Sequence, residues 1–229
     1  MKRRGIAAGL GLAVLLTATP FLAAGAGAVD APARPQTVVI GLDLSKSNPL
    51  VEDGAYAARV AARLTSEIDG LPVRSRVMVR TFGAYDSAAN PLKVDEVISA
   101  RARPESVADG ISALVTALPQ LVAEGKLKAQ DWTYIVSFME TMSHQVDCAA
   151  GDVRFILLTD GFEDSEQARL LRGGSLPKPY PYYQGCTELV MLGVGQGGGS
   201  PAVTKRAREQ WEGWAQAAGF QRFTGLYDW

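Results

Sequence analysis

The apolar positions of this chain follow two spacings, one typical of buried strands and the other typical of helices. Short runs rich in apolar and β-branched residues predict strands at 38–42, 76–83, 93–100, 153–158, 188–194 and 222–227. Apolar residues three or four positions apart predict helices at 55–68, 105–124, 132–146 and 202–218. The acidic segment 163–166 predicts one more short helix.

The order of these elements indicates the fold class. Strands alternate with helices along the chain, and we expect the short third strand to run antiparallel to the second. This order predicts an α/β fold with a doubly wound, mostly parallel, Rossmann-like sheet that is flanked by helices. We expect it to form a single domain.

The first 28 residues have the layout of a cleavable secretory signal. A basic start at 2–4 precedes an apolar stretch at 6–24, and small residues follow at 26–28. We expect cleavage near Ala28 and export of the protein, either to the periplasm or out of the cell. The alternative is an uncleaved membrane anchor, although several glycines and Pro20 weaken the apolar stretch.

The remaining chain is predicted to consist of a short linker and one domain. Residues 29–36 form a Pro-rich linker, and residues 37–229 form the domain. Removal of residues 1–28 leaves 20 Lys plus Arg against 24 Asp plus Glu, a net charge of −4. This balance argues against a nucleic acid as the partner.

Two cysteines, Cys148 and Cys186, each precede a predicted strand by a few residues. The amino ends of consecutive parallel strands lie at the same edge of a sheet, and an exported location favours oxidation. We therefore expect a disulfide, with two buried free thiols as the alternative. Closing a loop of 37 intervening residues would stabilise the fold by ~4 kcal/mol on the loop-entropy account.

Oxygen-bearing side chains follow two of the predicted strands. The first strand runs directly into Asp43-Leu44-Ser45-Lys46-Ser47, which places a carboxylate and two hydroxyls at alternate positions. The strand at 153–158 runs into Thr159-Asp160-Gly161 and supplies a second carboxylate. Open α/β sheets bind ligands at the carboxyl ends of their strands. Hard oxygen donors gathered there indicate a divalent cation.

Together, and in this order, the two motifs resemble the von Willebrand factor A-type (VWA) domain. The metal-ion-dependent adhesion site of that family reads Asp-x-Ser-x-Ser, then a Thr, then an Asp before Gly. The resemblance implies that Ser45 and Ser47 bind the cation directly. It also implies that Asp43 and Asp160 act through water or in a mixed manner.

The resemblance further implies a threonine ligand from an intermediate loop. We assign this role to Thr133, which stands at the start of the helix predicted before the second aspartate's strand. The family usually has glycines beside this Thr, whereas here Asp131 and Trp132 occupy those positions. Thr141 and Thr159 remain alternatives.

The donor set suits Mg²⁺ or Mn²⁺, and Ca²⁺ if the site is loose. The resemblance implies a binding module and not an enzyme, in which the cation binds an Asp or Glu of a protein partner. We expect no small-molecule substrate, and contact with a membrane only through a partner in the cell envelope. Lys46, between the two serines, is expected to point outward, because alternate positions of the loop face apart.

Three other interpretations are open. The same site could serve a metal-dependent phosphoesterase or other hydrolase, with Glu163 or Asp164 as the general base. The domain could instead be structural, with a degenerate, metal-free site and the lysine between the serines turned inward. In the simplest interpretation, Asp43 and Ser45 cap the next helix and Asp160-Gly161 form a turn.

Overall fold

The computed structural model describes residues 33–85 and 90–228, which belong to one compact unit. The predicted signal segment at 1–28 and the first four residues of the predicted linker lie outside the described residues. Gln36, the last residue of the predicted linker, already begins the first strand.

In the described part of the chain, six strands form one sheet in the order β3-β2-β1-β4-β5-β6. Their bounds are Gln36–Asp43 (β1), Arg76–Phe82 (β2), Lys93–Val97 (β3), Asp152–Leu158 (β4), Glu188–Leu192 (β5) and Arg222–Leu226 (β6). Among these described strands, only β2 and β3 pair in the antiparallel sense, as the sequence predicts. The strand order reverses between β1 and β4, and such a switch point opens a crevice at the carboxyl ends of the two strands.

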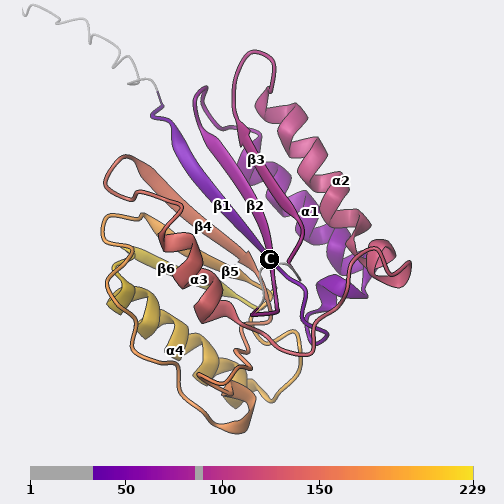
Figure 1. The fold of residues 1–229 in the computed structure, drawn as a ribbon, viewed down its shortest axis with the longest axis vertical. Coiled ribbons are helices and arrows are strands. Elements are labelled where there is room, and N and C mark those ends of the chain that lie inside the picture. The colour runs from indigo at the N-terminus through magenta and orange to yellow at the C-terminus, as the bar shows by residue number, and fades with distance from the viewer. Residues whose placement is uncertain (1–32, 86–89, 229) are drawn as a thin grey trace, which may run out of the picture. The chain divides into compact units, whose positions relative to one another are not determined.

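Helices cover both faces of this sheet (Figure 1). Their bounds are Gly54–Ile68 (α1), Pro104–Ala123 (α2), Ile135–Ser143 (α3) and Pro201–Ala218 (α4), with single 3-10 turns at Pro49–Val51 (η1) and Leu170–Arg172 (η3). One apolar cluster lies between the sheet and α1 and α2, and a second lies between the sheet and α3 and α4. Successive side chains of β1 enter the two clusters in turn, because side chains alternate across a strand.

Two sequence predictions of helix are wrong in part. The helix expected at 132–146 is shorter, because Thr133 instead exchanges two backbone hydrogen bonds of 3.1 Å with Asp164. The same pairing keeps the acidic segment 163–166 out of a helix, and the short turn η3 forms farther along the chain. Both errors arise from a contact between segments about 30 residues apart. The spacing of apolar residues within one segment cannot reveal such a contact.

The disulfide between Cys148 and Cys186 is present, with the two Cα atoms 4.7 Å apart. It lies beside the amino ends of β4 and β5, where Thr187 N–H donates to the Val153 carbonyl at 2.8 Å. The prediction of a pair is confirmed, and that of two free thiols is wrong.

Helix α2 is long and apolar enough, with a mean hydropathy of 1.4, to meet the length and composition of a membrane span. Its buried positions nevertheless pack into the same apolar cluster as α1, and they are Val107, Ala108, Ile111, Val115 and Leu118. A core helix of a globular domain has the same composition. We therefore interpret α2 as a core helix.

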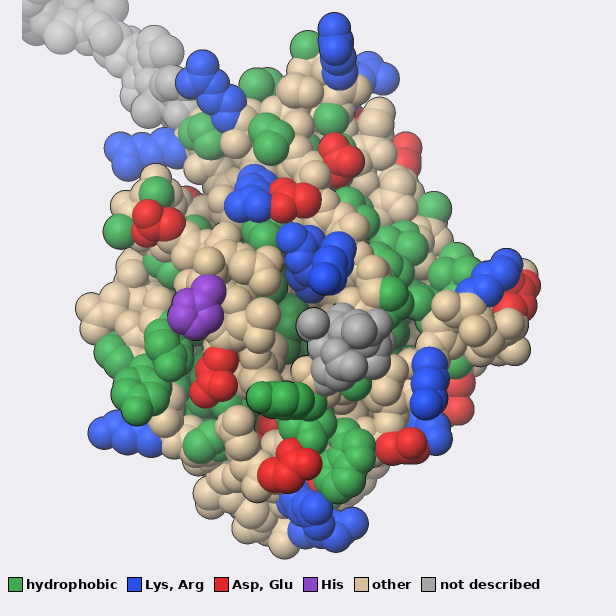
Figure 2. All heavy atoms as spheres, in the orientation of Figure 1, with side chains coloured by type: hydrophobic (Ala, Val, Ile, Leu, Met, Phe, Trp, Pro, Cys, Tyr) green, Lys and Arg blue, Asp and Glu red, His purple; other side chains and the backbone are tan. Residues whose placement is uncertain are grey.

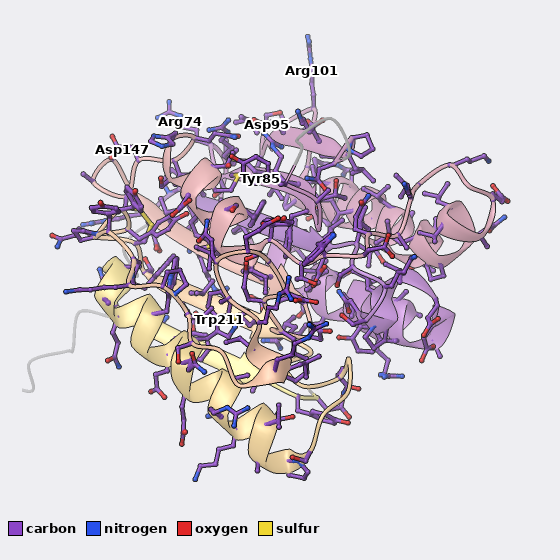
Figure 3. The ribbon with its side chains drawn as sticks, turned by 60° about the horizontal axis from the view of Figure 1, so that its bottom comes forward. Arg74, Tyr85, Asp95, Arg101, Asp147 and Trp211 are labelled. Carbon is purple, nitrogen blue, oxygen red and sulfur yellow. A yellow bond between two sulfur atoms is a disulfide. The ribbon has the colours of Figure 1, made fainter. Side chains whose placement is uncertain are left out.

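Helix α4 carries the residue that joins the second apolar cluster to the loop after β4. Figure 3 labels this residue, Trp211. Its side chain is fully buried beside Trp214, with ring centroids 5.5 Å apart. Its indole N–H donates to the Gly161 carbonyl at 2.7 Å. The turn that carries the second predicted carboxylate is thus fixed to α4.

Candidate functional site

The two predicted aspartates lie at the switch point of the sheet. Asp43 is the last residue of β1, and Asp160 follows the end of β4 by two residues. The strands pair in parallel up to Leu42 and Leu158, so both aspartates leave the sheet at the same edge. Both side chains are fully buried.

The Asp43 carboxylate is held by donors from two loops. Its Oδ1 accepts from Ser45 N–H at 2.8 Å, and its Oδ2 accepts from the Thr159 hydroxyl at 2.6 Å. The Asn48 amide donates to the backbone carbonyls of Asp43, at 3.0 Å, and of Leu158, at 2.9 Å. These bonds fix the β1 loop to the end of β4 and hold the carboxylate in one orientation.

The Asp160 carboxylate is held at only one of its oxygens. Its Oδ1 accepts from Phe162 N–H at 2.9 Å, in the turn made by Gly161. Its Oδ2 is buried and makes no hydrogen bond of normal geometry among the described residues, although the Ser47 hydroxyl lies close enough to the carboxyl to lower its pKa. The backbone of Gly197 covers this oxygen so closely that any side chain at 197 would overlap both Oδ2 and the Ser47 carbonyl. The glycine-rich loop after β5 therefore approaches the acids as backbone only.

The two serine hydroxyls lie next to each other, with Oγ atoms 3.3 Å apart. Ser45 is buried and Ser47 is exposed. Lys46, between them, extends into solvent and pairs with Asp131, Nζ to Oδ1 2.5 Å. The prediction of an outward lysine is confirmed.

The electrostatics of the two acids favour an additional positive charge. Burial, and then the nearby Asp160, raise the pKa of Asp43 from 3.8 to about 7. Burial also raises the pKa of Asp160, and the Ser47 hydroxyl offsets part of that rise. Among the described residues, no Lys or Arg lowers the pKa of either carboxyl. Two buried acids thus lie near each other, and no basic side chain of the described residues compensates their charge.

The predicted threonine ligand reaches this edge of the sheet on a separate loop. Gln130 exchanges backbone hydrogen bonds with the β1 loop, donating to Leu44 at 2.8 Å and accepting from Lys46 at 2.9 Å. Thr133, three residues later, is buried and pairs through its backbone with Asp164. Its loop therefore lies between the two loops that carry the aspartates. Within residues 33–85 and 90–228, no hydrogen bond joins the Thr133 hydroxyl to the other four predicted ligands.

The two alternative threonines have other contacts. Thr141 is exposed on α3, and its hydroxyl donates to the Ser137 carbonyl at 2.9 Å. Thr159 holds Asp43, a positioning role that the sequence analysis missed together with that of Asn48. A polar residue at the end of a buried apolar strand was the available signal for Thr159.

Helix capping does not explain the first motif. Helix α1 is capped by Asp53, whose carboxylate accepts from Ala55 N–H at 2.8 Å and from Tyr56 N–H at 3.0 Å. The interpretation of Asp43 and Ser45 as caps of the following helix is therefore wrong. The simplest interpretation holds only for the later motif, which does form a turn.

The two residues proposed as a general base have structural partners. Glu163 is buried, and its Oε2 accepts from the N–H groups of Ile135 (2.8 Å) and Val136 (3.0 Å), which caps α3. Burial raises the pKa of Glu163 to about 7. Asp164 is half-buried, and its Oδ1 lies 3.6 Å from Nε of the Arg169 guanidinium. Neither contact is with the aspartate pair.

No protein-family profile and no curated protein matches the sequence. Among solved structures, one match is the open conformation of the pilus adhesin SpaC from Lactobacillus rhamnosus GG, at 15% identity and a TM-score of 0.48. The match covers 86% of this chain but 28% of the adhesin, so this chain spans less than a third of that protein. A likeness at this level carries no information about which residues bind a partner.

Proposed function

We propose that this protein is an exported binding module of the VWA type. In this proposal a divalent cation beside Asp43 and Asp160 binds a carboxylate of a partner protein. The observation that carries the proposal is the buried acid pair, which lacks a basic counter-charge among the described residues. Burying carboxylates in this way is costly unless something positive compensates them.

The donors around the pair suit a hard cation. Ser45 and Ser47 would bind it directly, Thr133 would complete the set, and the two aspartates would act directly or through water. In the described residues no three His, Cys, Asp or Glu side chains gather as a metal-binding group, and the proposed site is of a different kind. Its oxygens suit Mg²⁺ or Mn²⁺, with Ca²⁺ as the weaker candidate.

The charge of the site suggests how a partner would bind. Two carboxylates leave a divalent cation close to neutral, so the affinity for the cation alone should be modest. A carboxylate from another protein could then enter the remaining coordination position. The disulfide fits an oxidising compartment and supports export, either to the periplasm or out of the cell.

Cation binding can be tested on the protein lacking residues 1–28. We expect Mg²⁺ or Mn²⁺ to raise the melting temperature of the wild type and to give a saturable calorimetric titration. Asp43→Ala should abolish both signals. Asp109→Ala is the matched control, because it removes an exposed aspartate of α2, which carries none of the proposed ligands, and should leave both signals intact.

Two results would contradict the cation proposal. One is a wild type that binds neither ion, and the other is an Asp43→Ala variant that binds as well as the wild type. If cation binding holds, an affinity pull-down with and without chelator tests the partner step. Partner proteins retained equally in both conditions would exclude a bridging role for the cation.

A further inference from the structure

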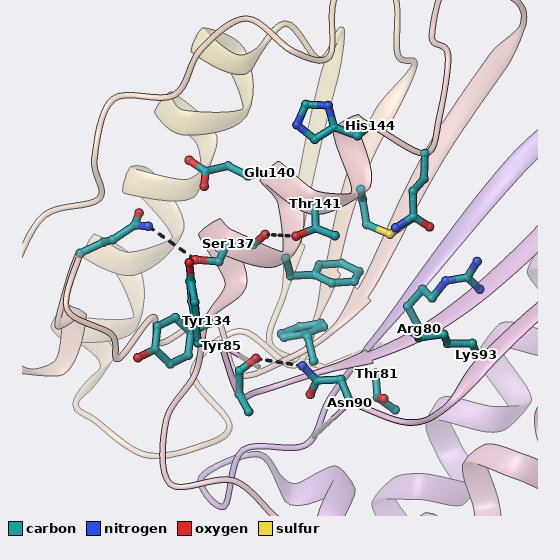
Figure 4. Close-up of a pocket in the computed structure, with 16 residues that line it drawn as sticks. Arg80, Thr81, Tyr85, Asn90, Lys93, Tyr134, Ser137, Glu140, Thr141 and His144 are labelled. Carbon is teal, nitrogen blue, oxygen red and sulfur yellow. Dashed lines mark hydrogen bonds between the residues drawn. The ribbon is translucent and has the colours of Figure 1, made fainter. Parts of the chain in front are cut away.

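A cavity of about 790 Å³ lies between α3 and the β2–β3 side of the sheet (Figure 4). Its volume is typical of sites that enclose small organic molecules. The side chains of the aspartate pair do not line it. The cavity is therefore a candidate site of its own.

The cavity contains an aromatic surface. Phe82 from β2 and Phe138 from α3 stack with ring centroids 4.5 Å apart; both are largely buried, and they line the cavity together with the buried Met142 of α3. At one end, the exposed Tyr85 ring lies 5.7 Å from the ring of the largely buried Tyr134. Such a surface can accept a flat apolar group.

A fixed guanidinium lies on the sheet side of the cavity. Arg80 is only 14% exposed at its side chain, and its Nη1 donates to the carbonyls of Val79 (2.9 Å) and Val94 (2.6 Å). These bonds leave the side chain little freedom to move. A preorganised guanidinium loses little entropy when it binds an anion.

Lys93 adds a second positive charge beside Arg80. The two residues are directly paired in the β2–β3 register, and Figure 4 shows their side chains together on the sheet side. Among the described residues Lys93 makes no ion pair, and Asp95 is mainly bound by Arg76 at 2.7 and 2.5 Å. Asp95 also accepts from Arg80 Nη2 at 3.5 Å, and this one acid faces Arg76, Arg80 and Lys93, which leaves the corner with a net positive charge.

The wall formed by α3 carries polar and acidic side chains and a histidine, unlike the basic sheet side. It presents Ser137, Glu140, Thr141 and His144, and Figure 4 shows them across the cavity from the two basic residues. Figure 2 shows the same separation at the surface, with Lys and Arg side chains over the region of β2 and β3 and the His to one side. A ligand with one anionic group therefore fits better than one with an anion at each end.

We propose that this cavity binds an aromatic carboxylate. The carboxylate would bind Arg80 and Lys93, and the ring would pack on Phe82 and Phe138. The ligand can be a free organic acid or the carboxyl-terminal aromatic residue of a peptide, since the two share this chemistry. The site goes beyond the cation-mediated function and does not depend on it.

The test uses the protein lacking residues 1–28, in EDTA, and follows ligand binding by NMR chemical-shift changes. The probes are 3-phenylpropionate and its neutral match, 3-phenylpropionamide. We expect the acid to bind at least tenfold more tightly than the amide, with shifts at Phe82, Phe138 and Met142. In Lys93→Gln this preference should fall to about twofold, while Lys126→Gln, a change at an exposed lysine elsewhere, should retain it.

A second arm distinguishes the two sources of the ligand. The peptide Gly-Gly-Ala-Phe is compared in its free-acid and carboxyl-amidated forms. A free-acid peptide that binds more tightly than 3-phenylpropionate supports the site and identifies a chain terminus as its ligand; the opposite order supports it and identifies a small acid. Equal binding of acid and amide, shifts outside the cavity, or an unchanged preference in Lys93→Gln would each overturn the proposal.

Discussion

Asp43→Asn should make the cation-free protein more stable while removing its response to Mg²⁺. The substitution deletes one of the two buried charges and keeps the shape of the side chain. The amide oxygen can still accept from Ser45 N–H, but the amide nitrogen cannot accept from the Thr159 hydroxyl, which loses this acceptor. The variant therefore removes the charge and one hydrogen bond, and a lost hydrogen bond costs about 1 kcal/mol, less than the charge does.

The magnitude follows from the raised pKa of Asp43. Its carboxyl has a pKa of about 7 in the folded protein against 3.8 ordinarily. Between these values the folded state holds more protons than the unfolded state, so wild-type stability falls as the pH rises from about 4 to about 7. Above pH 7 the loss amounts to about 4 kcal/mol at most. The gain from Asp43→Asn should thus be larger at pH 8 than at pH 5.

The assay is urea unfolding at pH 5 and pH 8, in EDTA and in excess Mg²⁺. In EDTA at pH 8 we expect the variant to have the higher unfolding free energy. In excess Mg²⁺ the difference in unfolding free energy between the variant and the wild type should shrink or change sign, because only a protein that binds the cation gains stability from it. A variant less stable than the wild type in EDTA at pH 8 would refute the reasoning, since the carboxylate would then not be a destabilising charge.

Three further predictions concern the surroundings of the site. Thr159→Val removes the donor to Asp43 and should reduce the Mg²⁺-induced rise in melting temperature; an unchanged rise would rule out a positioning role for this hydroxyl. Glu163→Gln should raise the unfolding free energy at pH 8 by up to about 3 kcal/mol and by less at pH 5, because the pKa of Glu163 is raised from 4.5 to about 7 and the amide oxygen still caps α3. Replacing Cys148 and Cys186 together with Ser should cost about 4 kcal/mol in urea unfolding, and added reductant should then have no further effect.

Much of the fold follows from short-range pattern. The buried strands are runs of apolar residues, and each prediction of a strand lies on an observed one. Asp43 and Asp160 could be assigned to one edge because each follows a parallel strand, and parallel strands end on the same side. This inference needs only the order of elements, which the sequence displays.

The remaining features depend on contacts between distant segments. The local sequence pattern predicts a short helix at Glu163, but its carboxylate caps a helix that begins 28 residues earlier. The close approach of Gly197 to Asp160 likewise depends on how the loop after β5 folds back. Periodicity and propensity describe neighbours along the chain, so neither can indicate such pairings.

The covalent bond between Cys148 and Cys186 has a consequence for how this protein can change shape. It joins the amino ends of β4 and β5, whereas the aspartates lie at the opposite ends of the strands, roughly 20 Å away at the usual rise per residue. Only noncovalent contacts are observed between the acid-bearing loops and their neighbours in the described chain. The disulfide thus fixes the amino-terminal end of the sheet. The loops at the carboxyl-terminal end can change conformation around a ligand without straining a covalent cross-link.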